Sequence, residues 1–233
     1  KVMKKIILFL TLITTIFLPN FLSSHVKHYS DLKYLEYEIY LNNGLIGKHV
    51  FNFKKNKDTL LVITEGKFKV KRLGIDLMDY STKTKETYVN GHLTNFYSET
   101  FQNDKRKYVI LTHNKQKKLF EIDGSSFKGE TDVSNIIGSW WNHEIINKKT
   151  QISAVSGRVL PQKVKFLGKK DMILFDKKYK ALKFSFLSND NKPLDKKKIN
   201  FNLWYDEDSL LWLKMSYEKF GQWEYRLKNY TFY

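Results

Sequence analysis

Short segments in which apolar and polar residues alternate follow one another from Tyr34 to the end of the chain, with turn-forming residues between them. A period of two residues is typical of antiparallel strands that bury one face and expose the other. In Leu60–Val70, one face ends in charged residues, whereas the other carries Val62, Thr64, Gly66, Phe68 and Val70. Helical periodicity is nearly absent, so we predict an all-β fold.

Three Asx-Gly pairs separate alternating segments: Asn43-Gly44, Asn90-Gly91 and Asp123-Gly124. This dipeptide favours type I′ turns, in which both central residues have positive φ. Each pair therefore predicts a hairpin. Later strands are predicted at Lys107–His113, Val159–Leu167, Lys180–Leu187, Ile199–Tyr205, Leu210–Lys219 and Gln222–Tyr230.

One segment, Thr131–Ile146, departs from the alternating pattern. Asp132 or Ser134 is a suitable N-cap for a short helix there. The helix would carry four large apolar residues: Ile136, Ile137, Trp140 and Trp141. With about seven strands before it and six or seven after it, a flat open sheet is not expected. We expect a long antiparallel meander curled into a half-barrel or two packed sheets, plugged or crossed by this helix.

The N-terminus has the pattern of a signal peptide. Met3-Lys4-Lys5 precedes the apolar run Ile6–Leu18, which is short for a membrane span. We predict a leader over residues 1–24 and a single exported domain over residues 25–233, periplasmic or secreted. Because Leu22 replaces the small residue preferred before the cleavage point, an uncleaved membrane anchor is the alternative.

The charge is strongly basic, with 41 Lys+Arg against 24 Asp+Glu and a net charge of +17. Only four of the basic residues are arginines, whereas base and phosphate recognition favours arginine for its bidentate geometry. We therefore expect no nucleic-acid partner. The lysine runs Lys115–Lys118, Lys177–Lys180 and Lys196–Lys198 are interpreted as solvated turns, with contact to anionic lipid headgroups or polysaccharide as the alternative.

Metal and cofactor chemistry finds little support in the sequence. The absence of cysteine excludes disulfides, thiol nucleophiles, iron–sulfur clusters and cysteine-based zinc sites. His25 and His28 are candidates for copper at a free N-terminus, although a mobile tail explains them more simply. Asp206 and Asp208 have the alternation of calcium ligands, but a hairpin turn accounts for them better. We predict no metal and no cofactor.

Catalysis is not predicted either, because the chain has no G-x-S-x-G motif. A two-residue turn at Asn90-Gly91 would place Glu86 and Glu99 on one face, about 13 Å apart, which exceeds the carboxylate separations of glycosidases. The same face would carry an aromatic and hydroxyl wall, suited to a ligand cavity or a solvated sheet: Tyr80, Thr82, Thr84, Tyr88, Leu93, Tyr97 and Phe101.

Trp140 and Trp141 are adjacent, so their side chains are expected to point in different directions. One can anchor in the core while the other faces a cavity. The alternative is that both rings pack as parts of a plug.

Several short pieces along the chain resemble an uncharacterised family of exported bacterial proteins, a domain of unknown function built as a long antiparallel sheet. The similar pieces are Tyr40–Gly44 with Ile46-Gly47, Thr64–Val70 with Leu73-Gly74, Tyr80-Ser81 with Glu86, Gly91-x-Leu93, Ser98-x-Thr100, Ser139–Asn142, Ser156–Arg158 and Leu203–Asp206. The strand-rich architecture is similar, at the level of fold, to the curved half-barrels of periplasmic lipoprotein carriers. The family implies no activity.

These observations lead to a hypothesis of a binding or carrier module for an apolar or amphipathic envelope molecule. The candidate ligand-binding residues are Tyr80, Glu86, Ser98, Thr100, Trp140, Trp141 and Arg158, with Arg158 or a lysine at the cavity mouth. A structural or protein-interaction component of the envelope is the first alternative. An envelope hydrolase that uses Glu86 or Asp206 is the second.

Overall fold

The computed structural model describes residues 29, 31–72, 74–189 and 198–233. The predicted leader, His25, His28, Lys196 and Lys197 lie outside the described residues. The described chain is almost entirely β, which confirms the predicted fold class. Its strands are β1 Leu32–Leu41, β2 Gly44–Asn56, β3 Thr59–Arg72, β4 Ile75–Val89, β5 His92–Gln102, β6 Lys105–Asn114, β7 Leu119–Gly124, β8 Phe127–Asp132, β9 Ile136–Ile137, β10 Thr150–Ile152, β11 Val159–Leu174, β12 Lys177–Ser188, β13 Asn200–Asp206, β14 Trp212–Glu218 and β15 Gln222–Phe232.

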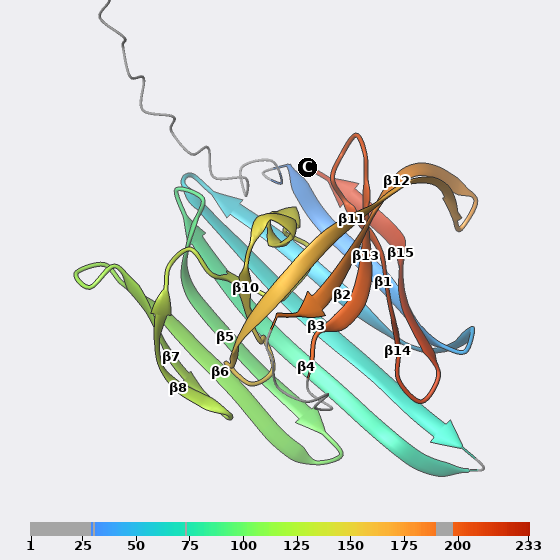
Figure 1. Ribbon diagram of the computed structural model, residues 1–233, viewed down its shortest axis with the longest axis horizontal. Helices are drawn as coiled ribbons and strands as arrows, with labels where there is room; N and C mark the ends of the chain where they lie inside the picture. The colour runs from blue at the N-terminus through green and yellow to red at the C-terminus, as the bar shows by residue number, and fades with distance from the viewer. Residues whose placement is uncertain (1–28, 30, 73, 190–197) are drawn as a thin grey trace, which may run out of the picture.

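All these strands form one curled sheet, in the order β8-β7-β6-β5-β4-β3-β2-β1-β15-β14-β13-β12-β11-β10-β9. Neighbours are antiparallel except β9 and β10, which are parallel. The two edge strands, β8 and β9, are separated in sequence only by residues 133–135. A sheet whose opposite edges follow each other so closely must bend round on itself, as Figure 1 shows. The predicted half-barrel is confirmed.

The two edges of the sheet meet along a seam. β8 and β9 do not pair in a ladder there, and the seam is closed by side-chain packing and by a few hydrogen bonds. Ser98 of β5 donates its hydroxyl to the carbonyl of Ala154 at 2.5 Å. The Ser126 amide donates to the Ser156 carbonyl at 3.1 Å. Residues from both sides form one apolar cluster across the seam: Phe96, Val109, Leu111, Phe120, Ile122, Ile137 and Ile152.

The core lies inside the curl, where the apolar face of each strand points. Alternate residues of β1 are buried, and Tyr37 is fully so. Its ring stacks on Trp212 with centroids 4.0 Å apart, and its hydroxyl donates to the Trp212 carbonyl at 2.7 Å. In the sheet β15 lies between β1 and β14, so this contact spans one strand on the inner face, which requires the sheet to curve there.

The predicted helix over 131–146 is not present. Ile136 and Ile137 form β9, and the only helical element in the described part of 131–149 is a 3₁₀ turn, η2, at His143–Asn147. Trp140 has φ 62°, a left-handed conformation that interrupts any helix at that point. The Asn142 side chain then accepts from the Glu144 amide and begins η2. The segment still enters the core, where Trp141 and Ile145 are buried.

The three predicted hairpins form, but only Asn90-Gly91 supplies both central turn residues, at φ 50° and 79°. At the first hairpin the turn is Asn42-Asn43, since Gly44 already pairs with Leu41. At the third, Gly124 pairs with Phe127 inside the ladder. Asparagine tolerates positive φ well, which allows the shift in the first turn. Among the described residues, no helix is long and apolar enough to cross a membrane.

Candidate functional site

A pocket of about 1040 Å³ opens at one end of the curled sheet, where the β1–β2, β3–β4 and β14–β15 hairpins meet. We call it the mouth pocket. Its lining is mostly apolar and aromatic, and the described residues contribute two lysines and no acidic side chain to it. The lining consists of Leu41, Asn42, Ile46, Phe68, Val70, Lys71, Leu77, Met78, Tyr80, Gln102, Tyr217, Lys219, Phe220 and Trp223.

Two stacked aromatic pairs form the walls of the mouth pocket. Phe68 lies opposite Tyr80 in the β3–β4 ladder, and their rings stack with centroids 4.6 Å apart. Tyr217 lies opposite Trp223 in the β14–β15 ladder, and these rings stack at 5.5 Å. Phe68 and Trp223 meet edge to face at 5.4 Å, which joins the two walls. Strand alternation thus turns four aromatic rings toward the interior.

The deep side of this region is polar but uncharged. Burial lowers the pKa of His49 to about 4, so the imidazole is neutral near pH 7. Its Nε2 lies 3.2 Å from the Thr64 hydroxyl, which lies 2.9 Å from that of Thr84. Tyr225 connects this group to the mouth, because it packs in the same apolar cluster as Tyr80 and lies 6.2 Å from His49 between ring centroids. The deep side therefore suits apolar or neutral groups.

Tyr80, Ser98 and Thr100 all lie on the inner face of β4 and β5, but only Tyr80 lines the mouth pocket. Burial raises the pKa of Tyr80, while side-chain hydrogen bonds to Thr100 and Thr82 partly oppose that rise. The Thr100 and Thr82 hydroxyls lie 2.8 Å apart. Thr100 thus supports Tyr80 from behind, whereas Ser98 belongs to the seam.

Glu86 and Trp141 form a separate, fully buried cluster. The Trp141 Nε1 donates to Glu86 Oε1 at 3.1 Å, and the Tyr88 hydroxyl donates to Oε2 at 2.5 Å. Burial raises the pKa of Glu86, and hydrogen bonds from Tyr88, Trp141 and Ser139 oppose the rise. No lysine or arginine of the described segments forms an ion pair with this carboxylate. The cluster is suited to holding residues 138–147, which we call the plug, in place.

The expectation that Glu86 and Glu99 share a face is wrong. An extra residue in β5, at Thr94, shifts the register between Thr87 and Tyr88. Glu86 then lies opposite Phe96 and points inward, while Glu99 points outward and accepts from Arg106 at 2.6 Å. The predicted wall is corrected in the same way, because Tyr97 and Phe101 are exposed on the outer face.

The two tryptophans of the plug have different surroundings. Trp141 is 1% exposed and contacts Phe53 and Tyr88 edge to face. Trp140 is partly exposed and packs against Tyr225 and Trp212, at centroid distances of 5.9 and 5.4 Å. Within the described chain, the indole nitrogens of Trp140 and Trp212 are buried without a hydrogen-bond partner. Trp140 therefore faces the Tyr225 side of the interior, toward the mouth pocket.

Arg158 and Asp206 lie elsewhere. Arg158 precedes β11, where its carbonyl accepts from the Ser153 amide, and it does not line the mouth pocket. Asp206 ends β13, and its Oδ2 accepts from the amide and hydroxyl of Ser209. It is the predicted turn residue. In the described segments no group of three His, Cys, Asp or Glu side chains is placed to hold a metal ion.

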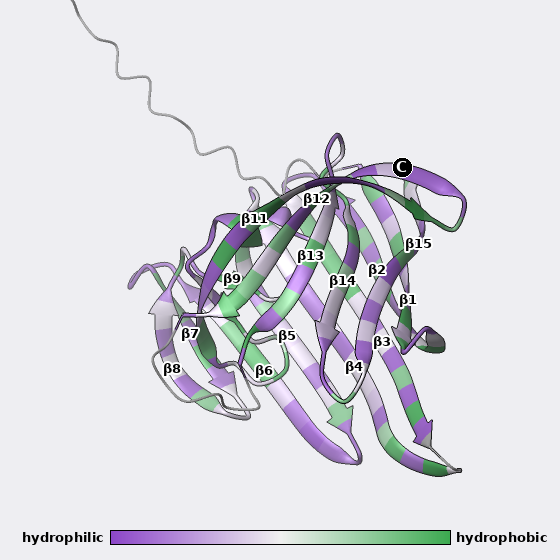
Figure 2. Ribbon diagram, turned by 45° about the vertical axis from the view of Figure 1, so that its right-hand side comes forward, coloured by the Kyte–Doolittle hydropathy of each residue, from purple (hydrophilic) through white to green (hydrophobic). Residues whose placement is uncertain are grey.

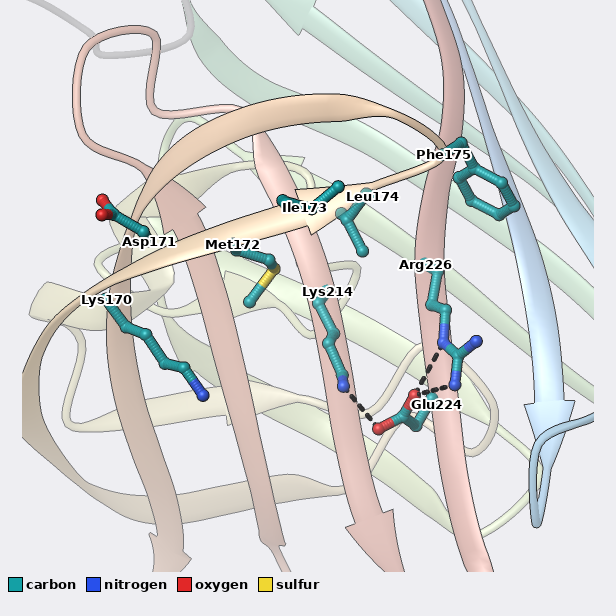
Figure 3. A pocket seen from close by; sticks show the side chains of 9 residues that line it. All are labelled: Lys170, Asp171, Met172, Ile173, Leu174, Phe175, Lys214, Glu224 and Arg226. Carbon is teal, nitrogen blue, oxygen red and sulfur yellow. Dashed lines mark hydrogen bonds and ion pairs between the residues drawn. The ribbon is translucent and has the colours of Figure 1, made fainter.

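A second pocket of about 480 Å³ lies between β11 and the outer face of β14 and β15 (Figure 3). Glu224 is buried there between Lys214, at 2.5 Å, and Arg226, at 2.6 Å. Burial alone would raise the pKa of Glu224, yet the hydrogen bonds and charges of Lys214 and Arg226 lower it below its usual value. These charges are paired with one another, so the pocket is lined by an ion-pair cluster that is satisfied within the protein.

Sequence reasoning missed most of the mouth pocket. Phe68 is predicted only as part of a strand face, and Tyr217, Trp223, Lys71 and Lys219 are not among the predicted ligand-binding residues. Their common signal is an aromatic residue or a lysine within a few positions of a hairpin turn. That signal becomes visible only when the topology shows which turns lie together.

A family model described as a domain of unknown function, DUF6134, matches residues 37–228. The chain belongs to the DUF6134 family. The DUF6134 match covers nearly the whole described sheet and confirms the resemblance to an uncharacterised family. No curated protein matches the chain.

The fold of this DUF6134 protein is similar to that of a crystal structure described as a beta-barrel-like protein of the domain of unknown function DUF1849 from Brucella abortus. The TM-score is 0.58 at 11% sequence identity, and the match covers 87% of this chain and 98% of that chain. At this identity the similarity concerns the fold alone, and it agrees with the curled, barrel-like sheet.

Proposed function

We propose that this DUF6134 protein is an exported binding or carrier module for an amphipathic molecule with an apolar chain and an anionic head. The observation that carries the proposal is the mouth pocket, an apolar and aromatic cavity of about 1040 Å³ with two lysines and no described acidic side chain in its lining. Small-molecule sites are commonly concave and mostly apolar, with a few polar groups that fix orientation.

The arrangement of the pocket suggests how such a molecule would lie. The stacked pairs Phe68–Tyr80 and Tyr217–Trp223 offer flat apolar surfaces for a hydrocarbon chain. Lys71 and Lys219 lie on the hairpins at the mouth, where an anionic head would remain hydrated. The apolar chain would lie along these stacked rings.

A binding role is favoured over catalysis by the state of the candidate carboxylates. Glu86 is held by Trp141 and Tyr88 inside the core, and Asp206 closes a turn. The predicted leader supports action outside the cytoplasm, where an envelope lipid or its fragment is the natural class of ligand.

Binding is tested by titrating the full chain with a dansyl-labelled fatty acid and displacing the probe with oleate. Met78 lines the pocket, so Met78→Glu places a charge in the apolar cavity and should weaken oleate binding by about tenfold or more. Met172→Glu is the matched control, because Met172 is also a partly buried strand methionine but lies in the second pocket. Equal affinities in the two variants would contradict the proposal.

The anionic head is tested separately. The double variant Lys71→Glu, Lys219→Glu should weaken oleate binding while binding of oleyl alcohol stays unchanged. The control double variant Lys85→Glu, Lys165→Glu makes the same change in net charge at exposed lysines away from the pocket. If both double variants lower oleate affinity equally, the mouth lysines have no specific role.

A further inference from the structure

The hairpin ends around the mouth pocket expose large apolar side chains to solvent. Phe220 is 92% exposed, Ile75 65%, Leu45 60% and Leu77 51%. We call these four residues the rim. They come from three hairpins that lie together only in the folded sheet, because long stretches of sequence separate the first two hairpins from the third. Leu77 and Phe220 also line the pocket. Figure 2 shows apolar bands near the end of the long β3–β4 hairpin.

Phe220 is held in its exposed position at a cost in conformational energy. It has φ 55°, a left-handed conformation that is uncommon for a large side chain. The next residue, Gly221, has φ 135°, and a Cβ there would lie 2.8 Å from the Asn42 side chain. The turn geometry thus fixes Phe220 at the tip of the β14–β15 hairpin.

The rim is fixed by hydrogen bonds between hairpins. The Gln222 amide donates to Asn42 Oδ1 at 2.9 Å, and the Asn42 amide donates to the Gln222 carbonyl at 2.9 Å. The β5–β6 turn is tied to β4 in the same way, since the Asp79 amide donates to Asn103 Oδ1 at 2.8 Å. Four hairpins are thus presented together at one end of the molecule.

The charges at this end favour an anionic partner. Lys71 and Lys219 stand at the pocket, and the acidic residues of the β3–β4 hairpin, Asp76 and Asp79, each lie 3.0 Å from Lys69. Asp76 also lies 3.6 Å from Lys71, so three lysines face two carboxylates at this end. The whole chain carries a net charge of +17, which attracts it to an anionic surface over a longer range. Exposed apolar tips beside lysines are the combination that inserts into the headgroup region of a bilayer.

We propose that the rim docks on the surface of an anionic lipid bilayer, with Phe220, Ile75 and Leu45 inserted among the headgroups and the mouth pocket facing the membrane. This docking goes beyond the proposed binding function and does not require the pocket to be occupied. It also supplies a route for an amphipathic molecule to pass between bilayer and pocket without crossing water.

The absence of cysteine from the chain allows a position-specific test. Phe220→Cys and Ile173→Cys are each labelled with the environment-sensitive dye NBD in the full chain. Ile173 is the control position, because it is as exposed as Ile75 but lies on the β11–β12 hairpin. Vesicles of phosphatidylcholine with phosphatidylglycerol should raise NBD emission at position 220 by about threefold or more and leave position 173 nearly unchanged.

Two matched substitutions test how much the rim contributes to the affinity of the protein for vesicles. Ile75→Ser should reduce binding to the same vesicles by roughly tenfold, and Ile173→Ser should not. The apolar run Ile6–Leu18 is common to all these proteins, so differences between them report the rim. Oleate binding measured on the same variants distinguishes failure of docking from failure of the proposed binding function.

Three results would overturn the docking proposal. The first is equal NBD responses at positions 220 and 173. The second is an equal response at position 220 on vesicles of phosphatidylcholine alone. The third is a response at position 220 that rises with protein concentration in the absence of vesicles, which would identify a second copy of the chain as the occupant of the rim.

Discussion

The indole nitrogen of Trp141 donates a hydrogen bond of 3.1 Å to the carboxylate of Glu86, although 55 positions separate the two residues in the chain. This bond joins the plug segment to β4 inside the curled sheet. Because the carboxylate is fully buried and receives its other donors from Tyr88 and Ser139, its protonation is coupled to the packing of the whole interior.

Glu86 should make stability depend on pH. Its pKa is raised in the folded protein by burial, so the folded state holds the proton more tightly than the unfolded state does. The stability contributed by this group is present below the usual glutamate pKa and is lost as pH rises through the raised value. Glu86→Gln should remove this loss, measured by urea unfolding between pH 4 and pH 8. Glu99→Gln, on the outer face of the same hairpin, is the control and should leave the slope unchanged.

Trp141 should contribute more to stability than Trp140. Trp141→Phe removes a donor from a buried carboxylate and should lower the free energy of unfolding by about 1–3 kcal/mol beyond the loss of ring area. Trp140→Phe is the natural comparison, because the Trp140 indole nitrogen has no hydrogen-bond partner in the described chain. Urea unfolding of the two variants should rank them in this order, and the reverse order would contradict the assigned role of Glu86.

His49 should destabilise the protein in acid. Its pKa is lowered from 6.5 to about 4 by burial, so the unfolded state binds a proton first as pH falls. The neutral imidazole contributes stability above about pH 6.5, and up to roughly 3 kcal/mol is lost as pH falls toward 4. His49→Gln should flatten the curve in this window. The exposed His92→Gln should behave like the wild-type protein, and a His49→Gln curve that follows the wild-type curve between pH 6.5 and 4 would show that His49 is not desolvated.

Gly124 should be needed for closure of the seam. A Cβ at this position would lie 2.7 Å from the Ser156 carbonyl oxygen and 3.0 Å from the Gly157 Cα. Gly124→Ala should therefore separate β7 from the Ser156 loop and lower the free energy of unfolding by about 1–3 kcal/mol. Amide exchange should show faster exchange at Ser126, whose amide crosses the seam. Gly44→Ala, where the nearest atom is 3.3 Å away at an exposed turn, should have a smaller effect.

The candidate site was predictable only in part. Tyr80 was identified from strand alternation and does line the mouth pocket, because a period of two residues reports which side chains share a face. Arg158 or a lysine was expected at the mouth of a cavity; Arg158 does not line the mouth pocket, whereas Lys71 and Lys219 do, and nothing local to these residues records which hairpins lie together. Glu99 was placed on the wrong face because the extra residue at Thr94 has no sequence signature that separates a bulge from regular pairing.

The chain of amino acids determined by itself that this protein is a sheet of many antiparallel strands, because alternation and turn residues act over two to four neighbouring positions. It also determined that the Trp140–Trp141 segment enters the interior, because such large apolar rings are rarely left in water. Only the tertiary structure decided that Phe68, Tyr80, Tyr217 and Trp223 form one pocket, and that Phe220 stands at its rim. The physical reason is that these contacts depend on the curl of the sheet, which brings Phe68 of β3 against Trp223 of β15. The two residues are far apart in sequence, and conformational preferences act only over neighbouring positions.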